Sequence, residues 1–137
     1  MRLPYYLSLL AQVYGKAGRA QEGLTSIDEA LSEARTHNER WWDAELHRLR
    51  GKLLLMPGAD ASDVEAAFLR AVQIARSQQA RSLELRATLS LARLWIAQNR
   101  PADARGRLQD VYAWFTEGFE TPDLQAARLL LAQLSPA

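Results

Sequence analysis

A weak internal repeat restricts the fold of this chain more than any other feature. Three sets of positions recur with a period of 40 or 41 residues in the 137-residue sequence. They are a set of small residues, a set of large apolar residues and a second, mostly small set (Ala11, Gly51 and Ala92; Ile27, Phe68 and Leu108; Ala30, Ala71 and Val111). A fixed period of this length is typical of proteins that stack copies of one supersecondary unit. We therefore predict three copies of one unit, over about residues 4–37, 39–78 and 80–117, in a single domain.

Each unit is expected to consist of two helices. Alanine and leucine supply 23 residues each, whereas valine and isoleucine together supply only 7. This bias favours helix over strand. Apolar residues at helical spacing predict a first helix that ends near Gly15 and Gly18. The same pattern predicts further helices over about residues 20–36, 40–55, 62–77, 82–98 and 101–117.

Cap and turn residues predict where several of these helices begin or end. Ser62 and Glu65 have the spacing of a capping box, which satisfies unpaired N–H groups at a helix start. Pro101 suits a first helical turn, and Gly118 suits a helix end. A seventh helix is expected over about residues 122–134. Its single apolar stripe would cap the end of a stacked array (Leu124, Ala127, Leu131 and Leu134).

The first helix carries apolar side chains around most of its circumference (Tyr5, Tyr6, Leu7, Leu9, Leu10, Val13 and Tyr14). A helix that is apolar all round is normally covered on both sides. We therefore expect this helix either to pack against an upstream neighbour or to form the contact face of a homodimer.

The repeated positions resemble the tetratricopeptide repeat. That repeat places a small residue in its first helix, an aromatic residue or leucine three positions later, and a small-large-small series in its second helix. In this sequence the pattern is carried by one set of residues in each unit (Leu10, Ala11, Tyr14, Gly18, Gly23, Ile27 and Ala30; Gly51, Leu54, Val64, Phe68 and Ala71; Leu91, Ala92, Trp95, Ala104, Leu108 and Val111). The period exceeds the family's usual length of about 34, and Arg50 occupies a position that is usually apolar. The resemblance implies an all-α fold, namely a right-handed α-solenoid of three helical hairpins with a C-terminal capping helix, or seven helices.

Three segments are similar to a more specific group. Residues 39–55, 82–95 and 112–124 resemble the C-terminal repeat region of bacterial proteins described as predicted ATPases or adenylate/guanylate cyclases. In that group the catalytic domains precede the repeats, and none of the catalytic parts is present in this sequence. The resemblance implies a regulatory or assembly tail of an ATPase- or cyclase-type protein.

The sequence contains no recognisable catalytic or metal-binding motif. It has no cysteine, which excludes disulfides, thiolate zinc sites and a cysteine nucleophile. The glycine-rich segment at residues 15–18 lacks the preceding strand and the remaining residues of a phosphate loop, so we interpret it as a turn between helices. Asp43 and His47 share a helix face, but two ligands make a poor metal site. We predict no enzyme activity, no cofactor and no metal.

The charge balance argues against nucleic-acid and membrane partners. Lys and Arg number 17 against 16 Asp and Glu, which leaves a net charge of +1 and no strong global field. No uncharged stretch approaches the roughly 20 residues that cross a bilayer. Polar residues and a proline interrupt the apolar N-terminal segment that would otherwise suggest a signal peptide. A cytoplasmic location is expected.

The four tryptophans are expected to be mostly structural. Trp95 occupies the aromatic repeat position, Trp114 follows the last turn of a core helix, and one of Trp41 and Trp42 must face inward. The other member of that pair is the one tryptophan that we consider for a surface function.

The repeat resemblance also implies one candidate surface. In such repeats the first helix of each pair lines a concave groove. The groove-facing positions correspond here to ten residues, of which five are cationic and one is anionic (Tyr5, Ser8, Gln12, Lys16, Glu45, Arg48, Lys52, Arg86, Leu89 and Arg93). One interpretation is a solvated polar face. The other is a groove for an acidic peptide, a terminal carboxylate or an anionic small molecule, because Arg side chains match carboxylates.

These features lead to three hypotheses for function. The first is a non-catalytic scaffold that binds a protein or peptide partner. The second is an effector-sensing module that holds a small anionic ligand in the groove. The third is homodimerisation through the apolar first helix.

Overall fold

The computed structural model describes residues 3–38, 40–56 and 59–134, and this part of the chain is all α. The helices are α1 (Leu3–Lys16), α2 (Ala20–Thr36), α3 (Asp43–Leu55), α4 (Ala61–Ser77), α5 (Arg81–Ala97), α6 (Pro101–Tyr112) and α7 (Pro122–Leu134). No strand occurs among the described residues. The predicted all-α fold and the seven helices are therefore confirmed for this part of the chain.

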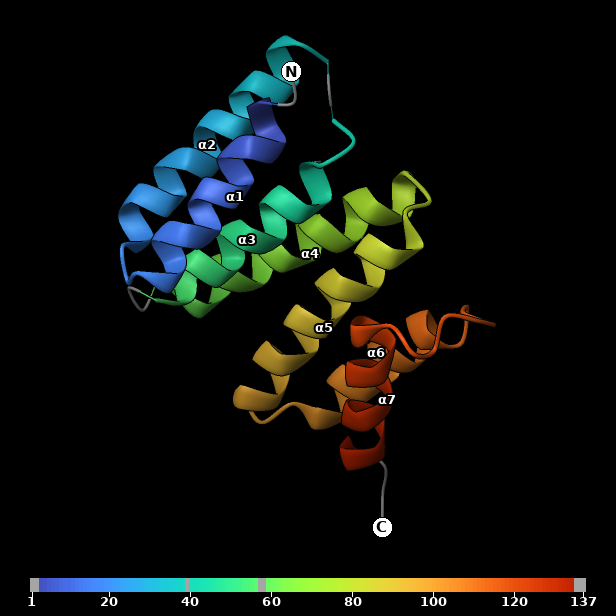
Figure 1. The fold of residues 1–137 in the computed structure, drawn as a ribbon. Coiled ribbons are helices and arrows are strands. Elements are labelled where there is room, and N and C mark those ends of the chain that lie inside the picture. The colour runs from blue at the N-terminus through green and yellow to red at the C-terminus, as the bar shows by residue number, and fades with distance from the viewer. Residues whose placement is uncertain (1–2, 39, 57–58, 135–137) are drawn as a thin grey trace.

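The helices follow one another in space as they do in sequence (Figure 1). Each helix packs against the next, and the odd-numbered helices also contact one another in series: α1 with α3, α3 with α5, and α5 with α7. Within the described ranges the even-numbered helices make no contact with each other. The odd-numbered helices thus share one side of the molecule, where side chains from all four can come together.

The residues that define the repeat are buried in every unit. All nine positions of the three sets lie in the interior. The closest fit is between α3 and α4, where a β-carbon added at Gly51 would lie 2.5 Å from the Phe68 ring. The period therefore records packing between helices, because a small residue on one helix makes room for a large one on the next.

Left-handed backbone conformations close four of the turns at repeating positions. The residues concerned have φ between 56° and 74° (Gly18, Asn38, Gln79 and Asn99). The turn after α5 shows the effect, since the Arg100 N–H returns to the Trp95 carbonyl at 2.8 Å and satisfies a carbonyl at the helix end. The predicted turn between α1 and α2 is confirmed at Ala17 and Gly18, whereas Gly15 and Lys16 still belong to α1.

The predicted capping box at the start of α4 is wrong. The helix begins at Ala61, so Ser62 lies inside it and Asp60 is the N-cap residue, without a side-chain cap. The Glu65 carboxylate instead accepts hydrogen bonds from the Trp95 indole N–H and from Arg100. A contact between helices has replaced the local one.

Two predicted helix boundaries also need correction. Helix α3 begins at Asp43 rather than near residue 40, and α6 ends at Tyr112 rather than near residue 117. After α6 the chain turns so that Phe115 packs on the core between α5, α6 and α7. Gly118, with φ of +78°, lies in the resulting loop and does not end the helix. Pro101 does open α6, as predicted.

The two terminal helices have the apolar faces expected of them. In α7, Leu124 and Ala127 are buried, and Leu131 and Leu134 pack partly against core clusters. In α1, several apolar side chains are exposed, most of all Val13 at 61 %. The structure therefore leaves part of the apolar surface of α1 uncovered.

Candidate functional site

A cavity of about 490 Å³ opens on the side of the odd-numbered helices. Its lining comes from α1, α3, α5 and α7 and from Trp42, the residue before α3 (Tyr5, Leu9, Gln12, Trp42, Glu45, Arg48, Arg86, Leu89, Ser90, Arg93 and Asp123). A volume in this range is typical of small-molecule and peptide side-chain sites.

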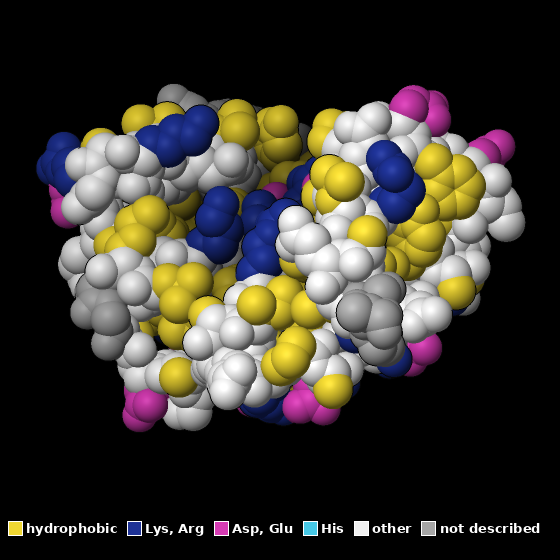
Figure 2. Space-filling view, turned by 90° about the horizontal axis from the view of Figure 1, so that it is seen from below, with side chains coloured by type: hydrophobic (Ala, Val, Ile, Leu, Met, Phe, Trp, Pro, Cys, Tyr) yellow, Lys and Arg dark blue, Asp and Glu magenta, His cyan; other side chains and the backbone are white. Residues whose placement is uncertain are grey.

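Two smaller hollows extend the cavity into a groove. One, of about 270 Å³, shares Arg48, Ser90 and Arg93 with it. The other, of about 120 Å³, shares Gln12 with the cavity and Lys52 with the first hollow. Figure 2 looks at the molecule from below and shows Lys and Arg side chains gathered in a depression between two raised parts. We refer to the cavity and the two hollows together as the groove.

Of the ten residues proposed for the groove, all except Ser8 line it. Lys16 and Lys52 line the smaller hollows. The other seven line the large cavity (Tyr5, Gln12, Glu45, Arg48, Arg86, Leu89 and Arg93). Leu89 is only 2 % exposed and forms part of the cavity floor. Ser8 is wrong as a groove residue, because it is fully buried and bonded to Trp42.

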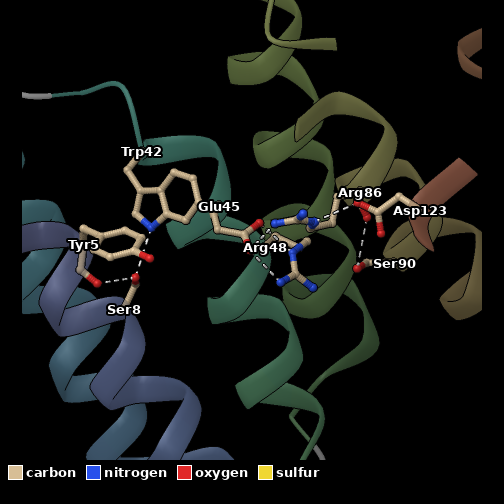
Figure 3. Close-up of polar contacts among 8 residues, drawn as sticks. All are labelled: Tyr5, Ser8, Trp42, Glu45, Arg48, Arg86, Ser90 and Asp123. Atoms are coloured by element: carbon tan, nitrogen blue, oxygen red, sulfur yellow. Dashed lines mark hydrogen bonds and ion pairs between the residues drawn. The ribbon is translucent and has the colours of Figure 1, made fainter. Parts of the chain in front are cut away.

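A chain of ion pairs crosses the floor of the cavity (Figure 3). Arg48 binds Glu45 through two hydrogen bonds of 2.8 Å, one to each carboxylate oxygen. Arg86 donates to Glu45 at 3.3 Å and to Asp123 at 3.0 Å. These contacts join α3, α5 and α7, and bidentate pairing of this kind fixes the orientation of a guanidinium group. Glu45 is 4 % exposed, and its negative charge is paired with Arg48 and Arg86 inside the protein.

Three further cations of the groove have no ion-pair partner among the described residues: Lys16 on α1, Lys52 on α3 and Arg93 on α5. Partial burial of its ammonium group lowers the pKa of Lys52, and Arg48, Arg93 and Lys16 lower it further, while Glu45 opposes them. Burial is therefore the main cause of the lowered pKa, and each of the three nearby cations adds a smaller effect that a bound anion would oppose.

Apolar side chains lie between these cations. Leu55, Phe68 and Leu94 line the hollow that contains Lys52 and Arg93. Leu49, Leu53 and Met56 line the hollow between Lys16 and Lys52. The groove therefore alternates positive and apolar contacts along its length.

The wall of the cavity opposite the arginines is aromatic. The rings of Tyr5 and Trp42 lie 5.5 Å apart at a 59° tilt, and the Trp42 indole N–H donates to Ser8 Oγ at 3.0 Å. Trp42 is the inward-facing member of its pair, whereas Trp41 is 47 % exposed and stacks on Tyr5. The sequence leaves open which tryptophan faces inward, and it does not indicate four of the lining residues: Leu9, Trp42, Ser90 and Asp123.

The other two tryptophans divide between core and surface. Trp95 is 6 % exposed, as predicted for the aromatic repeat position. The structural role predicted for Trp114 is wrong, because its side chain is 55 % exposed and packs on Arg81 and Phe115 at the surface. Helix α6 ends before Trp114, so no helical turn directs this ring inward.

Asp43 and His47 share a face of α3 within a group of arginines. Burial raises the pKa of Asp43 against the opposing effect of nearby arginines. Burial also lowers the pKa of His47, and Arg70, Arg50 and Arg35 lower it further. Asp43 Oδ1 is buried without a hydrogen-bond partner among the described atoms. Within residues 3–38, 40–56 and 59–134, no three His, Cys, Asp or Glu side chains are placed to hold a metal ion.

No family model matches this chain. An uncharacterized protein of Rhizobium meliloti (strain 1021) is 38 % identical over 99 residues, which are 72 % of this chain. The matched segment is 10 % of that protein, so this chain spans about a tenth of the relative's length.

In the described part of the chain, no helix is both long enough and apolar enough to cross a membrane.

Proposed function

We propose that this chain is a non-catalytic helical-repeat scaffold that binds an acidic segment of a partner protein in the groove. In this proposal the fold is a right-handed α-solenoid of three tetratricopeptide-like hairpins, closed by α7. The serial contacts among α1, α3, α5 and α7 support it, because stacked hairpins place their first helices along one concave side.

The observation that carries the proposal is the distribution of uncompensated charge. Each of the three hairpins contributes to the groove one cation without an ion-pair partner in the described chain: Lys16, Lys52 and Arg93. Apolar hollows separate these cations. An extended peptide that carries both carboxylates and leucine-like side chains matches this order, with charge giving specificity and apolar burial giving affinity.

The wider role that we propose is regulation or assembly of an ATPase- or cyclase-type protein. The Rhizobium meliloti relative, in which the matched segment is a tenth of a longer chain, supports a place within a larger protein. The ATPase or cyclase part of the proposal rests on the resemblance of residues 39–55, 82–95 and 112–124. A domain without catalytic groups inside such a chain is suited to recruiting a partner.

Fluorescence anisotropy with a labelled acidic peptide tests the groove. The probe is Gly-Glu-Leu-Asp-Glu-Leu-Asp-Gly, and its control replaces each carboxylate by the corresponding amide. Replacing Lys52 and Arg93 together by Glu should weaken binding about tenfold or more. The matched control reverses Arg105 and Arg128, which line no part of the groove. Equal affinity for both peptides, or equal loss in both double variants, would contradict the proposal.

A second candidate function is self-association of two copies through α1. The exposed Leu10 and Val13 side chains favour it, because a second copy of the same helix would cover them. Light scattering should then show a dimer that Val13→Glu converts to a monomer. A monomer at all accessible concentrations would exclude this candidate.

A further inference from the structure

We infer that the large cavity, within the groove, is a site for a small molecule that combines one aromatic ring with one carboxylate. This site uses Tyr5, Trp42 and Arg86, which line neither of the two smaller hollows, and it shares Arg93 with the surface proposed for the peptide. Binding of the small molecule does not require that the peptide binds.

The aromatic wall is held in place without a ligand. Ser8 is fully buried, accepts the Trp42 indole N–H at 3.0 Å and donates to the Tyr5 carbonyl at 2.6 Å. Trp42 is therefore fixed between α1 and α3, with the Tyr5 ring beside it. A planar ring in the cavity can stack or meet these rings edge to face, which adds to the gain from apolar burial. Leu9 and Leu89 complete the apolar lining.

The arginine wall is also fixed and retains unused donors. Figure 3 shows Glu45 between the aromatic pair and the two arginines Arg48 and Arg86. Arg48 uses Nε and Nη2 on Glu45, and Arg86 uses Nε on Asp123 and Nη1 on Glu45. Because a guanidinium has five N–H donors, each arginine keeps some of them. Glu45 holds these groups in position, so a ligand carboxylate meets donors that are already oriented.

The charge balance of the lining selects a monoanion. Arg48, Arg86 and Arg93 face two carboxylates, Glu45 and Asp123, which leaves one positive charge. Arg93 makes no ion pair within the described chain and supplies that charge. One carboxylate on Arg93 neutralises the cavity, whereas a neutral ring leaves the arginine without a counter-charge. An aromatic monocarboxylate satisfies both walls at once.

Nuclear magnetic resonance of the tryptophan indole N–H groups tests this inference. The probe is 1-naphthoate, with 1-naphthalenemethanol as the neutral analogue and acetate as the analogue without a ring. The Trp42 signal is assigned from its loss in Trp42→Phe. We expect 1-naphthoate to shift the Trp42 signal with a Kd below about 1 mM and to leave unchanged the signal of Trp114, which is exposed and does not line the cavity.

Three variants locate the probe. Arg93→Gln should weaken 1-naphthoate binding about tenfold. The neutral analogue, which lacks the carboxylate of 1-naphthoate, should bind the unchanged protein about tenfold more weakly than 1-naphthoate does. Tyr5→Ala should weaken 1-naphthoate binding several-fold and should weaken the acidic peptide less, since Tyr5 is 40 % exposed and lines the large cavity but neither of the smaller hollows. Arg128→Gln, on an exposed position of α7 outside the cavity, is the matched control.

The outcomes separate this site from the peptide groove. The inference is overturned if 1-naphthoate does not shift the Trp42 signal. That result would leave the peptide proposal unaffected, because the anisotropy measurement tests it separately. Equal binding of 1-naphthoate and its neutral analogue overturns it too, because the arginines would then play no part. If the acidic peptide does not bind but 1-naphthoate shifts the Trp42 signal, the proposed function is contradicted and the small-molecule site is supported.

Discussion

Replacing Gly51 by Ala should destabilise the protein, although glycine is a poor residue for the middle of a helix. Gly51 lies within α3, where alanine normally gains about 0.5–1 kcal/mol. At this position the new β-carbon would lie 2.5 Å from Phe68 Cε1 and 2.7 Å from Cδ1. Phe68 is 1 % exposed, so neighbouring side chains confine its ring on every side except toward the hollow that it lines. Overpacking of this kind costs about 1–3 kcal/mol, and we expect a net loss of about 1–2 kcal/mol.

A matched control separates packing from helix propensity. Gly106 lies within α6, and no atom would be within 4 Å of its added β-carbon. Gly106→Ala should therefore stabilise the protein by about 0.5–1 kcal/mol. Urea unfolding followed by circular dichroism measures both changes in the free energy of unfolding. In a thermal melt, each kcal/mol corresponds to a shift of about 3–4 °C in Tm.

The repeat itself supplies a compensating variant. The third unit has Ala92 and Leu108 at the positions of Gly51 and Phe68. Combining Gly51→Ala with Phe68→Leu should restore most of the stability that the first change removes, with a coupling energy of about 1 kcal/mol. The reasoning would be refuted if Gly51→Ala stabilised the protein as much as Gly106→Ala, or if the two changes were additive.

Three further predictions concern ionised groups. Burial lowers the pKa of His47 in the folded protein, so between pH 7 and pH 5 the unfolded chain binds more protons and acid favours unfolding. His47→Gln removes this group and should reduce the loss of stability over that pH range, measured by urea unfolding. The pKa of Lys52, followed by nuclear magnetic resonance, should lie below that of a free lysine and should rise when acidic peptide is added; no change on saturation would place the peptide elsewhere. Glu45→Gln should destabilise the protein by about 2 kcal/mol in urea unfolding, because Arg48 and Arg86 lose their shared carboxylate, and a cost near zero would show that the network is not structural.

The sequence predicts the helices of this protein well because the repeat is itself a record of packing. Positions such as Ala30 and Ala71 must be small wherever two helices approach closely, so their spacing reveals the unit. Helix ends are harder to predict, because long-range contacts compete with local signals. Glu65 illustrates this, since it bonds to Trp95 and Arg100, far away in sequence, rather than capping its own helix.

The groove was predicted in outline and not in its chemistry. The repeat register correctly placed residues such as Arg48 and Arg93 on one side of the molecule. It could not show that Arg48 is already neutralised by Glu45 while Arg93 is not, because that depends on side-chain geometry. Asp123 was missed for a similar reason, since it lies outside the three units and reaches Arg86 only through the packing of α7 on α5.

Positions 40 or 41 residues apart carry similar side chains in the core and dissimilar ones in the groove. Tyr5, Glu45 and Arg86 are separated by 40 and 41 residues, so they occupy one position of the repeat and carry an aromatic ring, an anion and a cation. Core positions cannot vary in this way, because burial restricts them to apolar side chains of limited size. At the groove position, one repeated backbone site therefore presents three chemistries in a fixed order from α1 to α5. We therefore expect a ligand that contacts all three positions to bind in one orientation, because the two ends of the series present different groups.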